Sequence, residues 1–225
     1  MLMGYGIWFL IGSVLSYLIG SVSFSIIAAK LSGDRTDIRS KGSGNAGFTN
    51  VLRTVGLAPA MATFAGDFLK GVAAVWLGRT ILTLATGTSD VILLSSMSYL
   101  CGLCCVVGHL YPCFFGLRGG KGILTAWSIM LLIDWRVFLV VISVFLVVLI
   151  VTKIVSLASL SAAVAYFPTI FLFTYFTNYK IYYNLTYLIF VSIVSVVISA
   201  MAIVKHRSNI ERLLAGSEKK ITRKR

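Results

Sequence analysis

The feature that most constrains the fold is a series of long apolar runs separated by short polar segments. Residues 1–29 contain no charged side chain, and runs of similar length cover 91–117 and 181–204. A helix needs about 20 apolar residues to cross a bilayer. A soluble domain is about one-quarter charged, whereas this chain is 58% hydrophobic and 12% charged. The sequence therefore predicts an all-α polytopic membrane protein, with residues 1–225 forming one membrane-integral domain.

Charge placement predicts how the chain is oriented. With the N-terminus outside, 16 of the 20 Lys and Arg fall in the inner loops and the C-terminal tail. Because basic residues favour cytoplasmic loops, this predicts an external N-terminus and a cytoplasmic C-terminus. The first run lacks a positive n-region and an obvious cleavage site, so we expect a retained helix and not a signal peptide. The fourth of about seven predicted spans is short, and a re-entrant segment is an alternative there; the seven cover 7–29, 54–84, 91–117, 122–133, 137–152, 154–179 and 181–204.

The net charge of +13 at first suggests nucleic acid as a partner. The basic residues, however, lie in short loops and a tail between apolar runs, so we expect anionic lipid or phosphate ligands and no nucleic acid. The seven acidic residues are scattered and form no carboxylate cluster for a divalent cation. We therefore expect neither a metal nor a cofactor.

A glycine-rich loop lies within residues 110–125, LYPCFFGLRGGKGILT. Gly119 and Gly120 precede Lys121, and Arg118 adds a second positive charge. Glycine permits close backbone approach to an anion, and a following helix offers its positive N-terminus. The loop predicts a phosphate site at the cytoplasmic surface; a flexible basic interhelical loop is the alternative.

A second polar loop, residues 41–56, reads KGSGNAGFTNVLRTVG. Arg53 offers a planar fork for phosphate. Helix capping explains one or two of the neighbouring hydroxyl and amide side chains, but not their density. The candidate ligands there are Ser43, Asn45, Thr49 and Asn50.

Ionisable residues also occur inside the apolar runs. Asp67 and Lys70 lie three residues apart, on one helical face, and charges inside a membrane usually face the bundle interior. We expect Asp67 to orient the polar loops and Lys70 to pair or to reach the surface. His109 is expected to be an ordinary polar helix end, and a supporting position beside the site is the alternative.

The C-terminal part carries a third polar segment, KHRSNIERLLAGSE, residues 205–218. His206 is a candidate general base, and Asn209 shares its face on a helix that continues the last span. Glu211 lies within the same two turns. A basic interfacial helix that binds acidic lipid is the alternative. Ser156 and Ser159 lie on one face of an earlier span, where they serve close packing or donate to a phosphate.

Together these segments resemble the PlsY family of bacterial membrane acyltransferases. The matching segments are GSGNAGFTNVLR (42–53), GHLYPCFFGLRGGKG (108–122) and HRSNIERLLAGSE (206–218). The resemblance implies acyl transfer from a long-chain acyl phosphate to the sn-1 hydroxyl of sn-glycerol 3-phosphate, in the bacterial inner membrane. It further implies association with the enzyme that forms the acyl phosphate. It places catalysis on Ser43, Arg53, Lys121, His206 and Asn209, and substrate binding on Asn45, Thr49, Asn50, Gly119, Gly120, Ser156, Ser159 and Glu211.

The chemistry leaves two routes to an activated hydroxyl. Either His206 accepts its proton, or a phosphate oxygen of a substrate does so and His206 acts as a ligand; we prefer the second.

A transporter of an organic phosphate is the competing class. The chain is short for that class, shows no evident inverted repeat, and carries its polar motifs on one side.

Overall fold

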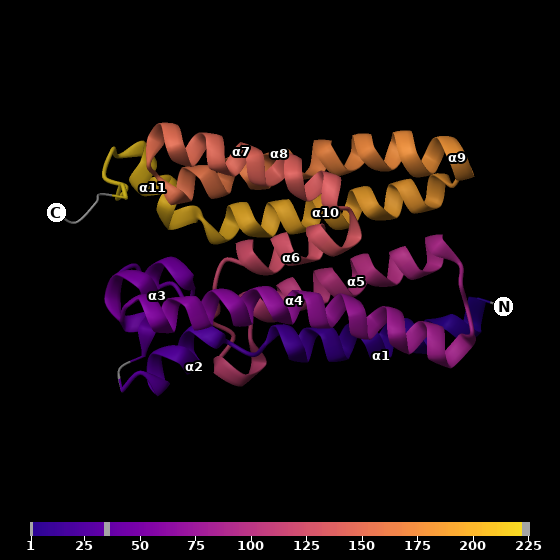
Figure 1. The fold of residues 1–225 in the computed structure, drawn as a ribbon, viewed down its shortest axis with the longest axis horizontal. Helices are drawn as coiled ribbons and strands as arrows, with labels where there is room; N and C mark the ends of the chain where they lie inside the picture. Colours follow the sequence, from indigo (N-terminus) through magenta and orange to yellow (C-terminus); the bar gives the residue numbers. More distant parts are fainter. Residues whose placement is uncertain (1, 34–36, 222–225) are drawn as a thin grey trace. The chain divides into compact units, whose positions relative to one another are not determined.

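The computed structural model describes residues 2–33 and 37–221, and its regular secondary structure over these ranges is helical. The chain divides into two compact units (Figure 1), which we describe separately. Unit 1 comprises Met1–Ile133, and unit 2 comprises Asp134–Arg225.

Unit 1 is a bundle in which α1, α4 and α5 pack against one another, with α6 against α4 and α5. α2 and α3 also pack against α4. The elements are α1 (Leu2–Gly20), α2 (Phe24–Leu31), the 3-10 turn η1 (Ile38–Ser40), α3 (Phe48–Thr54), α4 (Leu57–Thr86), α5 (Val91–Leu110), the 3-10 turn η2 (Cys113–Phe115) and α6 (Ile123–Ile133).

Glycines allow α1 and α5 to approach closely. A Cβ on Gly20 would collide with the carbonyl oxygen of Cys105, and one on Gly108 would collide with that of Tyr17. Small residues at such crossings are typical of membrane helices, whose association depends on packing instead of the hydrophobic effect. The first predicted span differs from expectation, because the helix breaks at residues 21–23 between α1 and α2.

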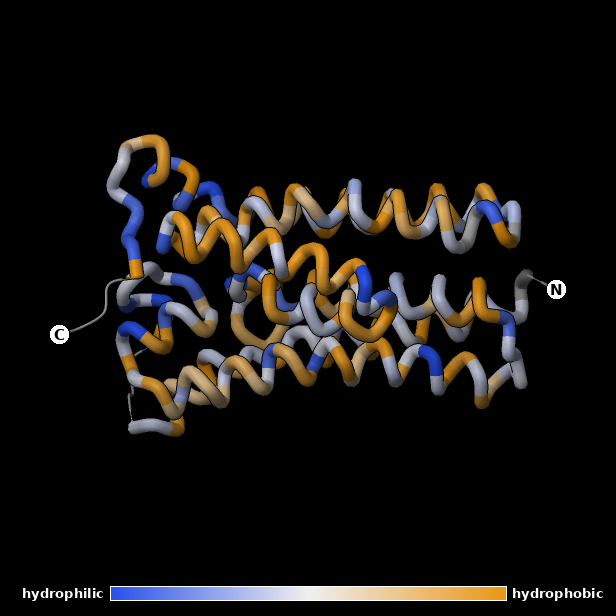
Figure 2. The backbone as a smooth tube through the Cα atoms, turned by 45° about the horizontal axis from the view of Figure 1, so that its top comes forward, coloured by the Kyte–Doolittle hydropathy of each residue, from blue (hydrophilic) through white to orange (hydrophobic). Residues whose placement is uncertain are grey.

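Unit 2 is built from three long helices, with α8 packed against both α7 and α10. Lys153 makes the tight turn between α7 and α8 in the left-handed region, with φ of 58°. In Figure 2, long orange stretches follow the helices, whereas blue segments lie mostly in turns and the tail. The elements are α7 (Trp135–Thr152), α8 (Val155–Thr174), the π-helical turn η3 (Tyr175–Tyr179), α9 (Lys180–Tyr182), α10 (Leu185–Lys205) and α11 (Arg207–Leu214).

Six helical segments in the described residues are long and apolar enough to cross a membrane, with α1 and α2 counted together as Gly4–Leu31, and they match six of the seven predicted spans. The remaining predicted span, 122–133, corresponds to a shorter helix, α6. α6 has 11 residues, so it rises about 16 Å, roughly half of the hydrocarbon core. Figure 1 shows it beside only part of α4. A straight helix of this length does not cross the whole hydrocarbon core, in line with the short fourth span that the sequence predicts.

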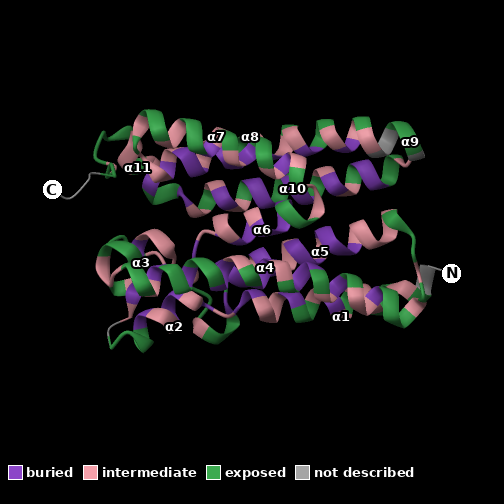
Figure 3. Cartoon of the chain, in the orientation of Figure 1, coloured by how far each residue is buried: buried purple, intermediate pink, exposed green. Residues whose placement is uncertain are grey.

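Burial follows the pattern of a membrane protein. Figure 3 shows buried residues along the packed sides of the unit 1 helices and exposed residues on their outer sides. Those outer positions carry large apolar side chains, such as Leu10 at 60% and Trp76 at 66% exposure, as does Ile150 of unit 2 at 73%. An apolar outer surface suits contact with lipid chains, which are as apolar as leucine.

Candidate active site

The polar loop at residues 41–56 precedes the glycine-rich loop in the chain and is called the first polar loop from here on; it is organised by a buried amide. Asn50 donates to the carbonyl oxygens of Ile38 (3.1 Å) and Lys41 (3.0 Å), and its Oδ1 accepts from the Ser43 amide (2.9 Å). The residue is only 2% exposed. We therefore assign Asn50 to shaping the loop, in place of the substrate contact that the sequence suggested.

The other candidate ligands of this loop lie nearer the surface. Ser43 and Arg53 are exposed, whereas Asn45 and Thr49 are half-buried. Arg53 occupies the last turn of α3. The structure thus presents the serine hydroxyl and the guanidinium outside the core of unit 1, where a polar substrate can reach them.

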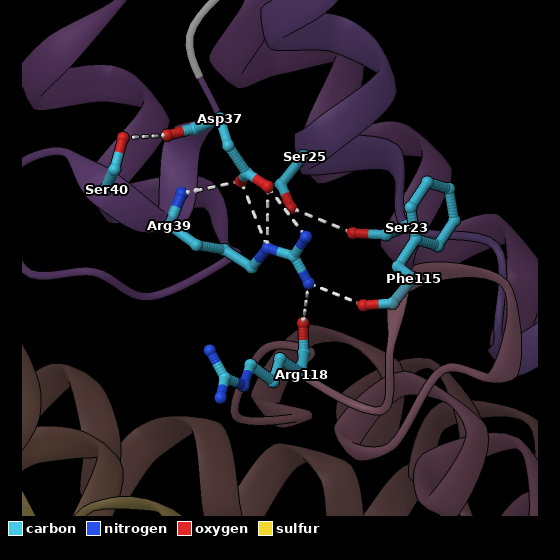
Figure 4. Close-up of polar contacts among 7 residues, drawn as sticks. All are labelled: Ser23, Ser25, Asp37, Arg39, Ser40, Phe115 and Arg118. Atoms are coloured by element: carbon cyan, nitrogen blue, oxygen red, sulfur yellow. Dashed lines mark hydrogen bonds and ion pairs between the residues drawn. The ribbon is translucent and has the colours of Figure 1, made fainter.

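An ion pair that the sequence analysis missed ties the first loop to the glycine-rich loop (Figure 4). The Arg39 guanidinium binds the Asp37 carboxylate at 2.6–3.0 Å, and its Nη1 donates to the carbonyl oxygens of Phe115 and Arg118. The hydrogen bond from Arg39 lowers the pKa of Asp37, and the same bond raises the pKa of Arg39. Both groups therefore stay charged across the neutral range. The sequence signal is the Asp-x-Arg spacing beside the loop.

In the glycine-rich loop, the first two glycines pack against the end of α5. The Gly119 amide donates to the Leu110 carbonyl and the Gly120 amide to the His109 carbonyl, both at 3.2 Å. These carbonyls belong to the last turn of α5, whose acceptors lack helical partners. The sequence predicted that these amides approach an anion, but in the structure they cap a helix.

The other anion-binding features of this loop lie just beyond these glycines. Lys121 is half-buried, and α6 begins two residues later at Ile123. The Ala126 amide bonds to the Gly122 carbonyl at 2.8 Å, which closes the first turn of α6. A lysine beside a helix N-terminus is an arrangement that favours phosphate.

Asp67 and Lys70 form a buried ion pair, with Nζ and Oδ1 2.8 Å apart and both side chains at most 3% exposed. Lys70 therefore pairs and does not reach the surface. Its Nζ also lies 2.9 Å from the Val22 carbonyl oxygen, in the break between α1 and α2, and 2.8 Å from His109 Nδ1. The expectation that His109 is an ordinary helix end is wrong, because the residue is 7% exposed and contacts this cluster.

In unit 2, the Glu218 carboxylate accepts hydrogen bonds from three side chains. Its Oε1 accepts from Ser156 and Asn209, both at 2.7 Å, and its Oε2 accepts from Arg212 at 2.6 Å. The structure thus brings together the two predicted residues Ser156 and Asn209. Ser159 is buried one turn further along α8.

Glu211, the carboxylate that the sequence favoured in this segment, does not take part in these contacts. That side chain is 63% exposed and pairs with Arg207 at 3.2 Å, outside the Glu218 network. The available signal for Glu218 was the Ala-Gly-Ser turn before it, where Gly216 has φ of 65°. This turn reverses the chain after α11, and the Ile221 amide then donates to the Lys153 carbonyl at 2.7 Å.

The contacts of Glu218 lead us to expect that the stability of the fold decreases in acid. Burial raises the pKa of this carboxyl, but the hydrogen bonds from Ser156, Arg212 and Asn209 outweigh it and leave the pKa below its ordinary value of 4.5. A lowered folded-state pKa stabilises the protein above the unfolded-state pKa, and this stability is lost as pH falls through the folded-state value. We expect the thermal midpoint of the wild type to decrease as the pH is lowered below 4.5. At neutral pH the midpoint of Glu218→Gln should be lower than that of the wild type, and it should decrease less on acidification. Glu211→Gln is the exposed control; equal acid sensitivity in Glu218→Gln and wild type would contradict the assignment.

His206 lies at the junction of α10 and α11, where the helix breaks and does not continue as predicted. The residue is 2% exposed, and its Nδ1 lies 2.7 Å from the Ala202 carbonyl oxygen. A carbonyl only accepts, so Nδ1 carries the hydrogen, and in the neutral ring Nε2 is the acceptor. The backbone N–H of Asn209 donates to the backbone carbonyl of His206 at 2.8 Å, which keeps the two residues within one helical turn.

Comparisons with known proteins show the family to which this chain belongs. The family of glycerol-3-phosphate acyltransferases matches residues 10–216. A glycerol-3-phosphate acyltransferase of Alkaliphilus metalliredigens is 39% identical over 209 residues, covering 93% of this chain and 94% of the relative.

Two crystal structures of PlsY, an integral membrane glycerol 3-phosphate acyltransferase, resemble the fold. The glycerol 3-phosphate form has a TM-score of 0.75 at 35% identity, covering 95% of this chain and 96% of that one. The lysophosphatidic acid form has a TM-score of 0.73 at 34% identity, covering 95% of each chain. This chain therefore belongs to the PlsY family of integral membrane glycerol-3-phosphate acyltransferases.

Proposed function

We propose that this acyltransferase takes a long-chain acyl group from acyl phosphate and transfers it to the sn-1 hydroxyl of sn-glycerol 3-phosphate. The products are lysophosphatidic acid and inorganic phosphate, in the first acylation of bacterial phospholipid synthesis. The observation that carries the proposal is the pair of cationic loops in unit 1, which Arg39 holds together through the Phe115 and Arg118 carbonyls. Two substrates that each carry phosphate repel one another, and Arg53 and Lys121 supply the charge that offsets this repulsion.

In the proposed reaction, the substrate hydroxyl attacks the acyl carbonyl carbon, and the bond to the phosphate oxygen breaks. The hydroxyl loses its proton, and phosphate leaves with the electron pair of the broken bond. An acyl phosphate is an activated donor, so the protein supplies mainly positioning and charge stabilisation. Ser43 donates to a phosphate oxygen in this scheme, as do Asn45 and Thr49.

The groups of unit 2 have separate proposed roles. The Ala202 carbonyl fixes the His206 tautomer, so Nε2 can accept the hydrogen of the substrate hydroxyl. In the neutral ring this geometry supports the route in which His206 accepts the proton, which the sequence analysis ranked second. Asn209, Ser156 and Ser159 are proposed to bind substrate, with Glu218 orienting the first two of them.

We further propose that the polar loops face the cytoplasm in the bacterial inner membrane. The proposal rests on the excess of basic residues in the loops assigned to that side. Glycerol 3-phosphate would enter from the cytoplasm, whereas the acyl chain would stay among the apolar helices. Acyl phosphate would come from its forming enzyme, a proposed partner.

The test of the reaction is an assay of the purified full-length protein with palmitoyl phosphate and glycerol 3-phosphate, in the presence of a chelator of divalent metals. We expect equal amounts of phosphate and lysophosphatidic acid. Parallel reactions supply palmitoyl-CoA or acylated acyl carrier protein. Product from those donors alone would overturn the acyl phosphate assignment, and product that requires divalent metal would overturn the metal-free reaction.

The Arg39 clamp is expected to affect glycerol 3-phosphate binding. Arg39→Lys keeps the charge but loses the planar fork that reaches the carboxylate and two carbonyls together. We expect the KM for glycerol 3-phosphate to rise roughly tenfold, since small displacements of positioning groups have effects of this size or larger. Steady-state kinetics on monodisperse protein measures the change.

Unit 2 offers a matched control for this substitution. Arg136 binds Asp134 with the same Asp-x-Arg geometry, at 2.7–3.0 Å. Its guanidinium lies over the Phe173 ring, 5.2 Å from the centroid, and in the sequence the residue lies outside both polar loops. Arg136→Lys should leave the KM unchanged; an equal rise in both variants would argue against a specific role for Arg39.

A further inference from the structure

We propose that His109 is a positioning residue, whose buried imidazole sets the glycine-rich loop against the first polar loop. The inference deepens the proposed function, because it rests on the role of these loops in binding glycerol 3-phosphate. Two contacts of the imidazole ring support it: Nδ1 lies against Lys70 Nζ, and Nε2 lies against Gly120.

The Nδ1 side fixes the tautomer. Lys70 Nζ is 2.8 Å from this nitrogen and also 2.8 Å from the Asp67 carboxylate, which favours the charged ammonium. An ammonium group has hydrogens to donate and no lone pair. Toward this ammonium, Nδ1 of a neutral His109 ring is therefore the acceptor, with the hydrogen on Nε2; the same nitrogen lies 3.5 Å from Asp67 Oδ1.

The Nε2 side meets both polar loops. A Cβ built on Gly120 would collide with His109 Nε2, and it would lie 2.5 Å from the Ala46 carbonyl oxygen and 2.9 Å from His109 Cε1. The ring, the glycine-rich loop and the first loop thus border one space too small for a methyl group. His109 also accepts the Gly120 amide through its own carbonyl, at 3.2 Å.

Both nitrogens of this ring face protein groups, Lys70 at Nδ1 and the Gly120 backbone at Nε2. His109 is 7% exposed, and Ala46 is completely buried. The imidazole therefore acts through the loops, which distinguishes it from the catalytic candidates.

The charged cluster holds the glycine-rich loop at both ends. His109 lies before it, at the end of α5. Thr125 lies after it, in the first turn of α6, and donates to the Asp67 carbonyl at 3.0 Å. Lys70 extends the same cluster to the Val22 carbonyl in the break between α1 and α2. The position of Lys121 thus depends on four segments of unit 1 that meet at the Asp67–Lys70 pair.

Two substitutions test the contacts of Nδ1 and Nε2 separately. In His109→Asn, the amide oxygen can replace Nδ1 as the acceptor for Lys70, but no atom reaches Gly120. We expect the KM for glycerol 3-phosphate to rise roughly tenfold, with the thermal midpoint close to that of the wild type. His109→Gln reaches the place of Nε2 but lacks the Nδ1 acceptor, so its midpoint should fall while the KM changes less.

A control in the same helix tests whether any buried change has this effect. Cys105 is buried on α5, and its thiol lies 3.7 Å from the Lys70 carbonyl oxygen. Cys105→Ala is expected to lower the thermal midpoint and leave the KM unchanged. Gly120→Ala places a methyl group against Nε2 while the imidazole itself is retained. It should raise the KM, and it is the test to use if His109→Asn does not fold.

An unchanged KM in folded His109→Asn, or in Gly120→Ala when the former does not fold, would overturn the inference. The failure of the proposed function looks different. If Lys121→Met is inactive while His109→Asn binds normally, only the role of His109 is lost. If Lys121→Met is fully active, the phosphate-binding role of the loop is itself wrong.

Discussion

Lys121→Met and Arg53→Ala are each expected to lower kcat/KM for acyl transfer by roughly a hundred- to a thousandfold, the loss that follows removal of one charge-stabilising donor from an active site. Lys121 lies directly before the N-terminal end of α6, and Arg53 lies exposed in the last turn of α3. Removing either leaves two phosphate groups with less positive charge to offset their repulsion. Release of phosphate from palmitoyl phosphate measures the effect.

The control for these variants must also remove one basic side chain. Arg79 of α4 is exposed and lies outside both polar loops. Arg79→Met should keep nearly full activity, which would show that overall charge is not the cause. Near-normal activity of monodisperse Lys121→Met or Arg53→Ala would sink the assignment of that residue.

Lys70→Met is expected to cost about 3–5 kcal/mol of stability, because breaking a buried ion pair leaves the other charge without compensation. The Asp67 carboxylate is 3% exposed, so solvent cannot replace the ammonium. The Val22 carbonyl and His109 lose the same partner. Thermal unfolding in a lipid-like detergent gives the change in midpoint.

The double variant Asp67→Leu, Lys70→Met tests the reason for that loss. Replacing both charges with apolar groups removes the uncompensated carboxylate, and such replacements are often neutral. We expect the double variant to regain much of the lost stability but to have impaired activity, since His109 loses its donor. A double variant as unstable as the single one would contradict the uncompensated charge as the cause. Arg207→Met, which breaks an exposed pair, should barely shift the midpoint.

The sequence predicted the helical spans well because length and apolarity are local properties. Six predicted runs appear as long apolar helices with ends shifted by a few residues. The motifs in their order were also enough to indicate the family, since the loops keep their sequence wherever the helices bring them. The break at residues 21–23 was not predictable in this way, because Gly20 and the nearby serines are as typical of tightly packed membrane helices as of helix ends.

The partners of the polar side chains were decided only by the tertiary structure. Asn50 and Glu211 carry side chains suited to substrate binding, but one is buried within its loop and the other lies exposed beside Arg207. Lys70 meets a carbonyl 48 residues away, and Ser156 meets a carboxylate 62 residues away. Sequence by itself determines which groups are available and that they lie near helix ends. Packing of distant helices determines which of them meet, because hydrogen bonds and ion pairs act over a few ångströms.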